Sequence, residues 1–149
     1  MSEAIRIETA HPRRTVRSVA AVLAGIVVDV LLTIGTDLAL HAARVFPPWG
    51  QPMIHADALM LLATSYRLVY GVAGSYITTA RLAPDQPLRH ALVGGVVGLI
   101  VCSVGAVATW NGGPAFGPHW YPLALVATAM PCAWLGGKLR VMQLGASLS

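Results

Sequence analysis

Apolar residues run in four long stretches along this chain, and short segments rich in proline, glycine and charge separate them. The stretches cover residues 18–40, 58–80, 91–109 and 121–137. An α-helix needs about 17 to 25 such residues to cross a bilayer. The pattern therefore predicts four spans within a single domain over residues 16–140, preceded by a polar tail (1–15) and followed by a short one (141–149).

Composition supports a membrane protein. Hydrophobic residues make up 56% of the 149 residues, charged residues 11%, and the mean hydropathy is +0.66. A soluble domain of this length would carry far more charge. The formal net charge of +4 does not indicate nucleic-acid binding, because the basic residues form no stripe with interleaved aromatics. The first stretch is too long, and contains two acids, for a cleavable signal peptide.

The basic residues at the edges of the stretches indicate an orientation. Those on one side are Arg6, Arg13, Arg14, Arg17, Arg81, Arg89, Lys138 and Arg140. The connections on the other side contain only Arg44. Because Lys and Arg concentrate in cytoplasmic segments, both termini are predicted to be cytoplasmic. The expected fold is an all-α integral membrane four-helix bundle with up-down-up-down topology.

Arg67 lies inside the second stretch, where a charge must be paired, solvated or neutralised. At about 1.5 Å per residue, Arg67 lies roughly 13 Å below the outer end of its span and Asp37 about 5 Å below the outer end of the first. Side chains lean toward the N-terminus of their helix, so these two lean toward each other. The sequence predicts an ion pair that fixes the first hairpin; a gate or a site for an anionic ligand is the alternative.

Asp29 lies deeper, about 17 Å from the outer end of its span, and has no evident cation. Thr33, one turn further along the same face, is its nearest predicted polar neighbour. Its carboxyl is expected either to stay protonated without a role or to bind a proton or an ion during transport. Asp29 and Thr33 are therefore the candidate proton or ion site.

Small residues at helical spacing predict where the spans approach one another, since small side chains allow close contact between helices in lipid. The candidate packing positions are Gly71, Gly74, Gly94, Gly98 and Gly105.

No pattern predicts a catalytic residue, a metal site or a cofactor. His41, His55, Asp57 and His119 are expected near the outer surface, but they lack the spacing of metal ligands. Cys102 and Cys132 lack a CxxC motif and are expected to be packing residues. Whether the chain is an enzyme stays open, although the residues favour a non-enzymatic role.

Several segments carry a resemblance to a known group. They are Gly35-Thr36-Asp37, residues 46–52, Tyr66-Arg67, Tyr70-Gly71, and residues 81–92, 116–125 and 131–137. In these segments the chain resembles small four-span bacterial inner-membrane proteins of unassigned function. The resemblance implies the bacterial inner membrane as the location, and it implies no activity and no site.

Two classes of function follow. The first is a non-catalytic subunit or scaffold that binds a larger membrane protein within the bilayer. The alternative is a small oligomeric transporter or channel, coupled to protons or ions through Asp29. A third class, an enzyme of lipid or quinone chemistry at the outer aromatic belt, is less favoured by the residues.

Overall fold

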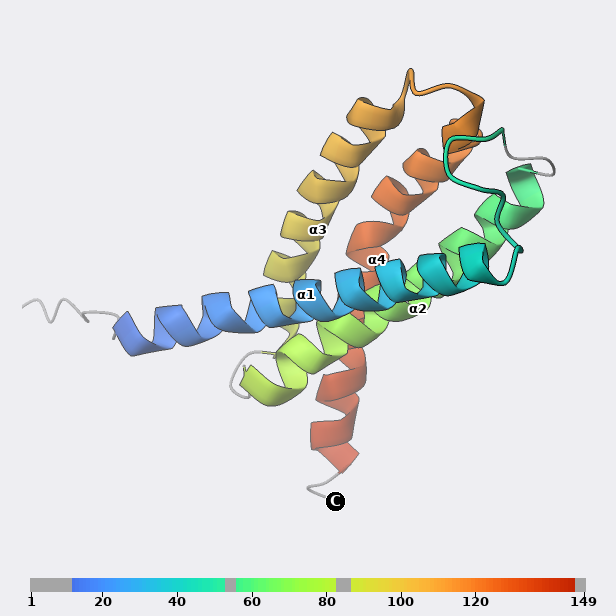
Figure 1. Cartoon of the computed structure of the whole chain (residues 1–149). Coiled ribbons are helices and arrows are strands. Elements are labelled where there is room, and N and C mark those ends of the chain that lie inside the picture. Colours follow the sequence, from blue (N-terminus) through green and yellow to red (C-terminus); the bar gives the residue numbers. More distant parts are fainter. Residues whose placement is uncertain (1–11, 53–55, 83–86, 147–149) are drawn as a thin grey trace, which may run out of the picture.

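The computed structural model describes residues 12–52, 56–82 and 87–146, and in these residues the chain forms helices and no strand (Figure 1). The α-helices are α1 (Pro12–Ala42), α2 (Ala56–Leu82), α3 (Pro87–Thr109) and α4 (Trp120–Ala146). A single 3-10 turn, η1 (Pro114–Phe116), lies between α3 and α4. The all-α class predicted from the sequence is confirmed.

All four helices extend beyond the predicted spans, and α1 and α4 extend furthest. α1 begins at Pro12, so residues 12–15, which were assigned to the tail, belong to the helix. α4 continues to Ala146, past the end of the apolar stretch at Gly137. Lys138 and Arg140 end the apolar pattern, but the residues that follow them are good helix formers and include no proline. Hydropathy therefore located the helices but not their ends.

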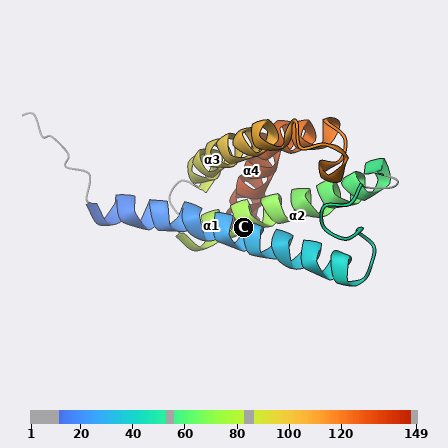
Figure 2. The same cartoon turned by 45° about the horizontal axis from the view of Figure 1, so that its top comes forward.

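The helices form two antiparallel hairpins, α1 with α2 and α3 with α4 (Figure 1). α2 contacts all three other helices, and α3 packs along α4. α1 lies mainly against α2, and its N-terminal end projects beyond the other helices in both views (Figure 2). The chain therefore alternates in direction as predicted, but α1 is less closely packed than a compact bundle requires.

Glycines mark the closest approaches between helices. A Cβ atom at Gly74 of α2 would lie 2.9 Å from the backbone oxygen of Gly25 in α1, and one at Gly136 of α4 would lie 2.5 Å from the backbone oxygen of Val72. α3 and α4 meet at Gly95 and Gly137, where an added Cβ would lie 2.6 Å from an alanine Cβ. A side chain at any of these four glycines would force the helices apart.

The predicted packing glycines divide into three groups. Gly74 makes a close approach, whereas Gly71 and Gly94 make ordinary contacts, with an added Cβ at 3.5 Å from Cys132 and 3.9 Å from Val22. No atom of the described residues lies within 4 Å of the Cβ position at Gly98 or Gly105. These two glycines lie on parts of α3 that no other described helix approaches closely.

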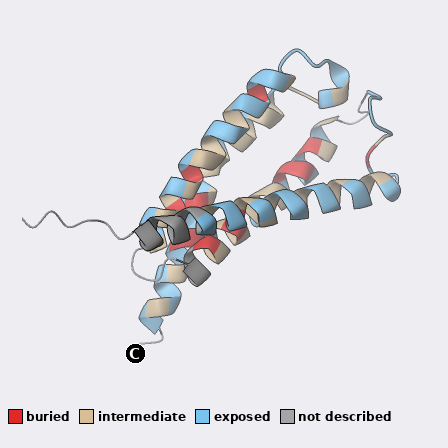
Figure 3. Ribbon diagram, turned by 60° about the vertical axis from the view of Figure 1, so that its left-hand side comes forward, coloured by how far each residue is buried: buried red, intermediate tan, exposed pale blue. Residues whose placement is uncertain are grey.

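Within residues 12–52, 56–82 and 87–146, two helical segments are long and apolar enough to cross a membrane, Val22–Ala42 and Pro87–Thr109, with mean hydropathies of 2.0 and 2.4. α2 and α4 are 27 residues long but less apolar, and Arg67 and three tyrosines interrupt α2. Many residues of α1 and α3 are exposed (Figure 3), and large apolar residues are among them. They include Leu23, Val27, Leu31, Ile34 and Leu38 on α1, and Val93, Ile100, Val104 and Val107 on α3.

The glycine contacts generate a stability prediction. Gly136→Ala should lower the free energy of unfolding in detergent micelles by about 1–3 kcal/mol, because the new methyl group meets backbone atoms of α2 that cannot move aside. The matched change Gly105→Ala meets open space and should leave stability unchanged or raise it by up to about 1 kcal/mol. Denaturant titration followed by circular dichroism measures both. Equal losses in the two variants would contradict the assigned contact between α2 and α4.

Candidate functional site

A polar cluster joins the C-terminal part of α1 to the middle of α2. Arg67 Nη2 lies 2.7 Å from Asp37 Oδ2, and the two side chains are 21% and 19% exposed. The hydroxyl of Tyr66 donates a hydrogen bond to the other carboxylate oxygen of Asp37, and Arg67 Nη1 donates to that hydroxyl at 3.1 Å. The structure thus brings the predicted pair together, and both oxygens of Asp37 are used.

Aromatic rings surround the guanidinium of Arg67. Its central carbon lies 5.1 Å from the ring centre of Tyr66 and 5.6 Å from that of Tyr121, distances at which the π-faces attract a cation. A hydrogen bond of 2.8 Å between the Thr36 and Tyr70 hydroxyls adds a further link between α1 and α2. Tyr121 comes from the start of α4, so the cluster connects the two hairpins.

A cavity of about 310 Å³ lies between the helices and is partly open. All four helices contribute to its wall, which is mostly apolar. Its polar or titratable side chains are Asp29, Thr33, Arg67, Ser75, Thr78, His90, Cys102, Thr128 and Cys132. Arg67 belongs both to this wall and to the ion pair, so the cavity adjoins the polar cluster.

Asp29 and Thr33 are the candidate proton or ion site predicted from the sequence. The structure places both residues in the cavity wall. One of its carboxyl oxygens, Oδ1, is buried and has no hydrogen-bond partner among the described residues. The opposing surface is α2 at Gly74, where an added Cβ would lie 3.5 Å from the Asp29 Cβ. A carboxyl oxygen left without a partner in a largely apolar wall is costly, so this group needs a proton or a cation.

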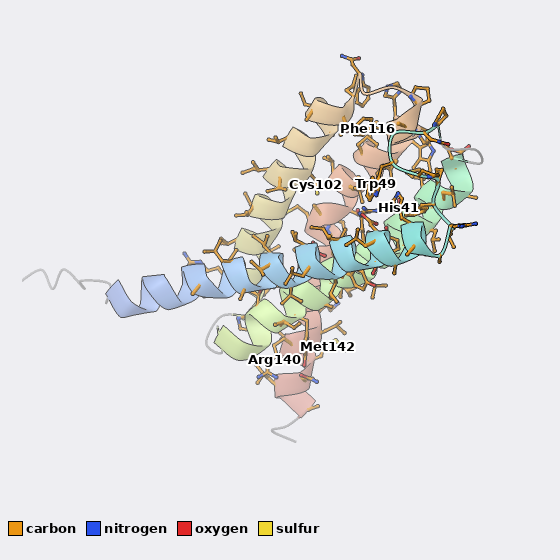
Figure 4. The ribbon with its side chains drawn as sticks, in the orientation of Figure 1. His41, Trp49, Cys102, Phe116, Arg140 and Met142 are labelled. Carbon is orange, nitrogen blue, oxygen red and sulfur yellow. The ribbon has the colours of Figure 1, made fainter. Side chains whose placement is uncertain are left out.

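Three titratable cavity residues were not identified as site residues from the sequence. His90, near the N-terminal end of α3, lies in the cavity wall. Cys102 of α3 (Figure 4) and Cys132 of α4 were interpreted as packing residues, and both line the same cavity as free thiols. Periodicity places such residues on a helix face, but only the arrangement of the four helices shows that these faces converge.

The outer histidines that were considered as metal ligands have separate partners. His41 stacks on Trp49 with ring centres 3.8 Å apart (Figure 4), and its Nδ1 lies 2.8 Å from the backbone oxygen of Asp37. His119 Nε2 lies 3.0 Å from the backbone oxygen of Trp110. Among the described residues, no group of three or more His, Cys, Asp or Glu is arranged to hold a metal ion, and His55 lies outside them.

Asp57, the remaining outer candidate, links the second helix to the start of the fourth. Its Oδ1 accepts a hydrogen bond of 2.7 Å from the indole Nε1 of Trp120. Gly117 lies beside Met60, where an added Cβ would approach the methionine sulfur to 3.0 Å. The loop between α3 and α4 therefore packs against the N-terminal end of α2.

In the part of the chain that the structure describes, fold and site define an all-helical protein with two helices able to cross a membrane, a charged cluster that connects its hairpins and a cavity beside that cluster. Comparison with protein-family models, with curated proteins and with solved structures finds no match to this chain.

The geometry of the ion pair predicts energetic coupling. Arg67→Leu and Asp37→Leu should each destabilise the protein, because either change leaves a partly buried charge without its partner. The double variant should recover part of that loss, with a coupling energy of about 0.5–3 kcal/mol from unfolding in detergent.

The control for this double-mutant cycle is a second cycle with Asp57→Leu in place of Asp37→Leu. Asp57 bonds to Trp120, so its effect should add to that of Arg67→Leu without coupling. Strict additivity in the first cycle would show that the contact contributes nothing to stability.

Proposed function

We propose that this chain is an integral membrane protein of the bacterial inner membrane, with four spans and both termini in the cytoplasm. The exposed apolar side chains of α1 and α3 support a lipid environment, since soluble proteins rarely leave such large apolar surfaces uncovered. α2 and α4 pack closely at Gly136, and α2 has its charge at Arg67 neutralised by Asp37. Pairing of this kind is what makes an ionisable residue tolerable within a bilayer.

We further propose that the protein binds a proton or a monovalent cation at Asp29 and functions as a small carrier. The observation that supports this proposal is the unpartnered carboxyl oxygen in a cavity bounded by all four helices. Asp37 already balances the charge of Arg67, so Asp29 is the acid that needs a counter-charge. Ionisable residues that face an intramembrane cavity commonly mark ion and proton pathways.

A different observation favours the second candidate, a non-catalytic subunit of a larger membrane assembly. Gly35, Gly98 and Gly105 have no atom of the described residues within 4 Å of their Cβ positions. Gly35 and Gly105 lie on exposed surface of α1 and α3, where a helix of another protein, or of a second copy of this chain, has room to approach closely.

The carrier proposal predicts a loss of flux on removal of one charge. In liposomes containing the wild-type protein, an imposed cation gradient should drive proton movement, and Asp29→Asn should abolish it, because the amide cannot exchange a proton. A pH-sensitive dye enclosed in the liposomes measures the movement. Asp57→Asn, which alters an exposed outer acid, is the matched control and should retain flux. The carrier role is wrong if wild-type liposomes show no flux or if Asp29→Asn retains it.

Purification from native membranes in mild detergent separates the two candidates. A carrier should purify alone or as a homo-oligomer, whereas a subunit should co-purify with a larger protein at fixed stoichiometry. If that partner is lost on Gly105→Leu but retained on Asp29→Asn, the surface of α3 forms the contact and the cavity does not. Mass determination of the purified complex gives the stoichiometry.

A further inference from the structure

The chemistry of the cavity wall restricts the cations that Asp29 can hold. This inference rests on the proposal that Asp29 binds a proton or a cation. A metal cation such as Mg²⁺ or Ca²⁺ needs about six or more oxygen ligands. The described part of the chain contains no cluster of acids, histidines or cysteines suited to a metal ion. Asp29 is the single carboxylate in the cavity wall.

Three of the four hydroxyl groups of the wall, all except that of Thr33, donate to backbone oxygens. Thr128 donates to Ala124 O at 2.6 Å, and Thr78 donates to Gly74 O at 2.9 Å. Ser75 reaches across to α4 and donates to Ala133 O at 2.9 Å. Their hydroxyl protons are already used, so none of these three groups donates a hydrogen bond to the Asp29 carboxylate.

The rest of the wall is aliphatic. Val22, Ile26 and Val30 of α1 line the cavity together with Leu68 of α2 and Leu125 of α4. Such a wall favours a ligand that is apolar over most of its surface and carries one positive charge at one end. An ammonium group beside Asp29 would satisfy the carboxylate, and the apolar remainder would bury itself against the aliphatic side chains.

The size of the cavity agrees with a small organic ligand. Its volume of about 310 Å³ is at the lower end of the range of roughly 300–1,000 Å³ for ligand pockets. A protein cavity of about 150 Å³ accommodates benzene, so this one has room for one ring and a short substituted amine. α1 lies mainly against α2, and the cavity is partly open, so entry does not require the whole bundle to separate.

We propose that the cavity between α1, α2, α3 and α4 binds a lipophilic monovalent organic cation, an aralkyl or alkyl ammonium, through the Asp29 carboxylate. The cation replaces the proton on that carboxyl, so one proton leaves for each cation bound. Binding should therefore weaken as the pH falls. The other titratable or charged groups in the wall are Arg67 from α2, His90 and Cys102 from α3, and Cys132 from α4.

Equilibrium binding of labelled benzyltrimethylammonium to the full-length protein in detergent tests this proposal. Wild-type protein should bind it at one saturable site. Neopentylbenzene, which has the same shape without the charge, should fail to displace it. Asp29→Asn should weaken binding by at least about tenfold, because the carboxylate that pairs with the ammonium is lost. Asp57→Asn should bind like the wild type.

A second variant keeps the proposal testable if Asp29→Asn does not fold. Gly98 lies in the cavity wall, and no described atom lies within 4 Å of its Cβ position, so Gly98→Leu fills the space while leaving Asp29 in place. This variant should also lose binding and keep the elution volume of the wild type in size-exclusion chromatography. Unchanged affinity in either Asp29→Asn or Gly98→Leu would overturn the proposal.

The binding assay tests the ligand class and the flux assay tests the carrier role, so the failure of one proposal can be distinguished from the failure of the other. If protons move in liposomes through Asp29 but benzyltrimethylammonium does not bind, the ligand class is wrong and the carrier proposal stands. If the cation binds through Asp29 but no flux occurs, the ligand class stands and the carrier role is wrong. If neither is observed, both proposals are wrong.

Discussion

The charge of Arg67 must be neutralised between the helices, and much of the arrangement of the chain depends on this requirement. α2 contacts every other helix, and Arg67 lies near its middle. A guanidinium that is mostly buried between helices needs a nearby counter-charge. Asp37 provides it from α1, and two tyrosine rings, one from α2 and one from α4, cover the guanidinium. One ion pair thus fixes the register of the first hairpin and draws the second hairpin toward it.

α1 is fixed to α2 at two places, and Asp29 lies between them. The first contact is the cluster around Asp37, and the second is the close approach of Gly25 to Gly74. Asp29 is one turn from Gly25 and about two turns from Asp37. Because both neighbouring contacts hold α1 against α2, Asp29 lies in the wall of the cavity. The position of this acid is therefore a consequence of the contacts on either side of it.

The sequence allowed prediction of the features that depend on local chemistry. Long apolar stretches gave the four helices, and the direction in which helical side chains lean gave the approach of Arg67 to Asp37. Features that depend on three or four helices together were beyond such reasoning. Tyr121 packs on Arg67 from the other hairpin, and His90 lines the cavity from the N-terminal end of α3.

The packing glycines show the same limit of prediction from the sequence. Gly74 and Gly98 both lie in small-residue patterns on their helices, yet only Gly74 meets a neighbouring backbone. Spacing identifies a face on which close approach is possible, but the partner helix decides which glycine is used.

The contrast between the two buried acids bears most directly on function. Asp37 has an arginine and a tyrosine hydroxyl bound to its two oxygens, as expected of a carboxylate with a structural role. Asp29 has a buried oxygen without a partner among the described residues, although Thr33 lies on the same wall and a serine and two further threonines line the cavity. A structural role for Asp29 would be served by hydrogen bonds such as those of Asp37. An acid beside open space and without such bonds is instead suited to a ligand that comes and goes, since a proton or cation can bind there without displacing an existing contact.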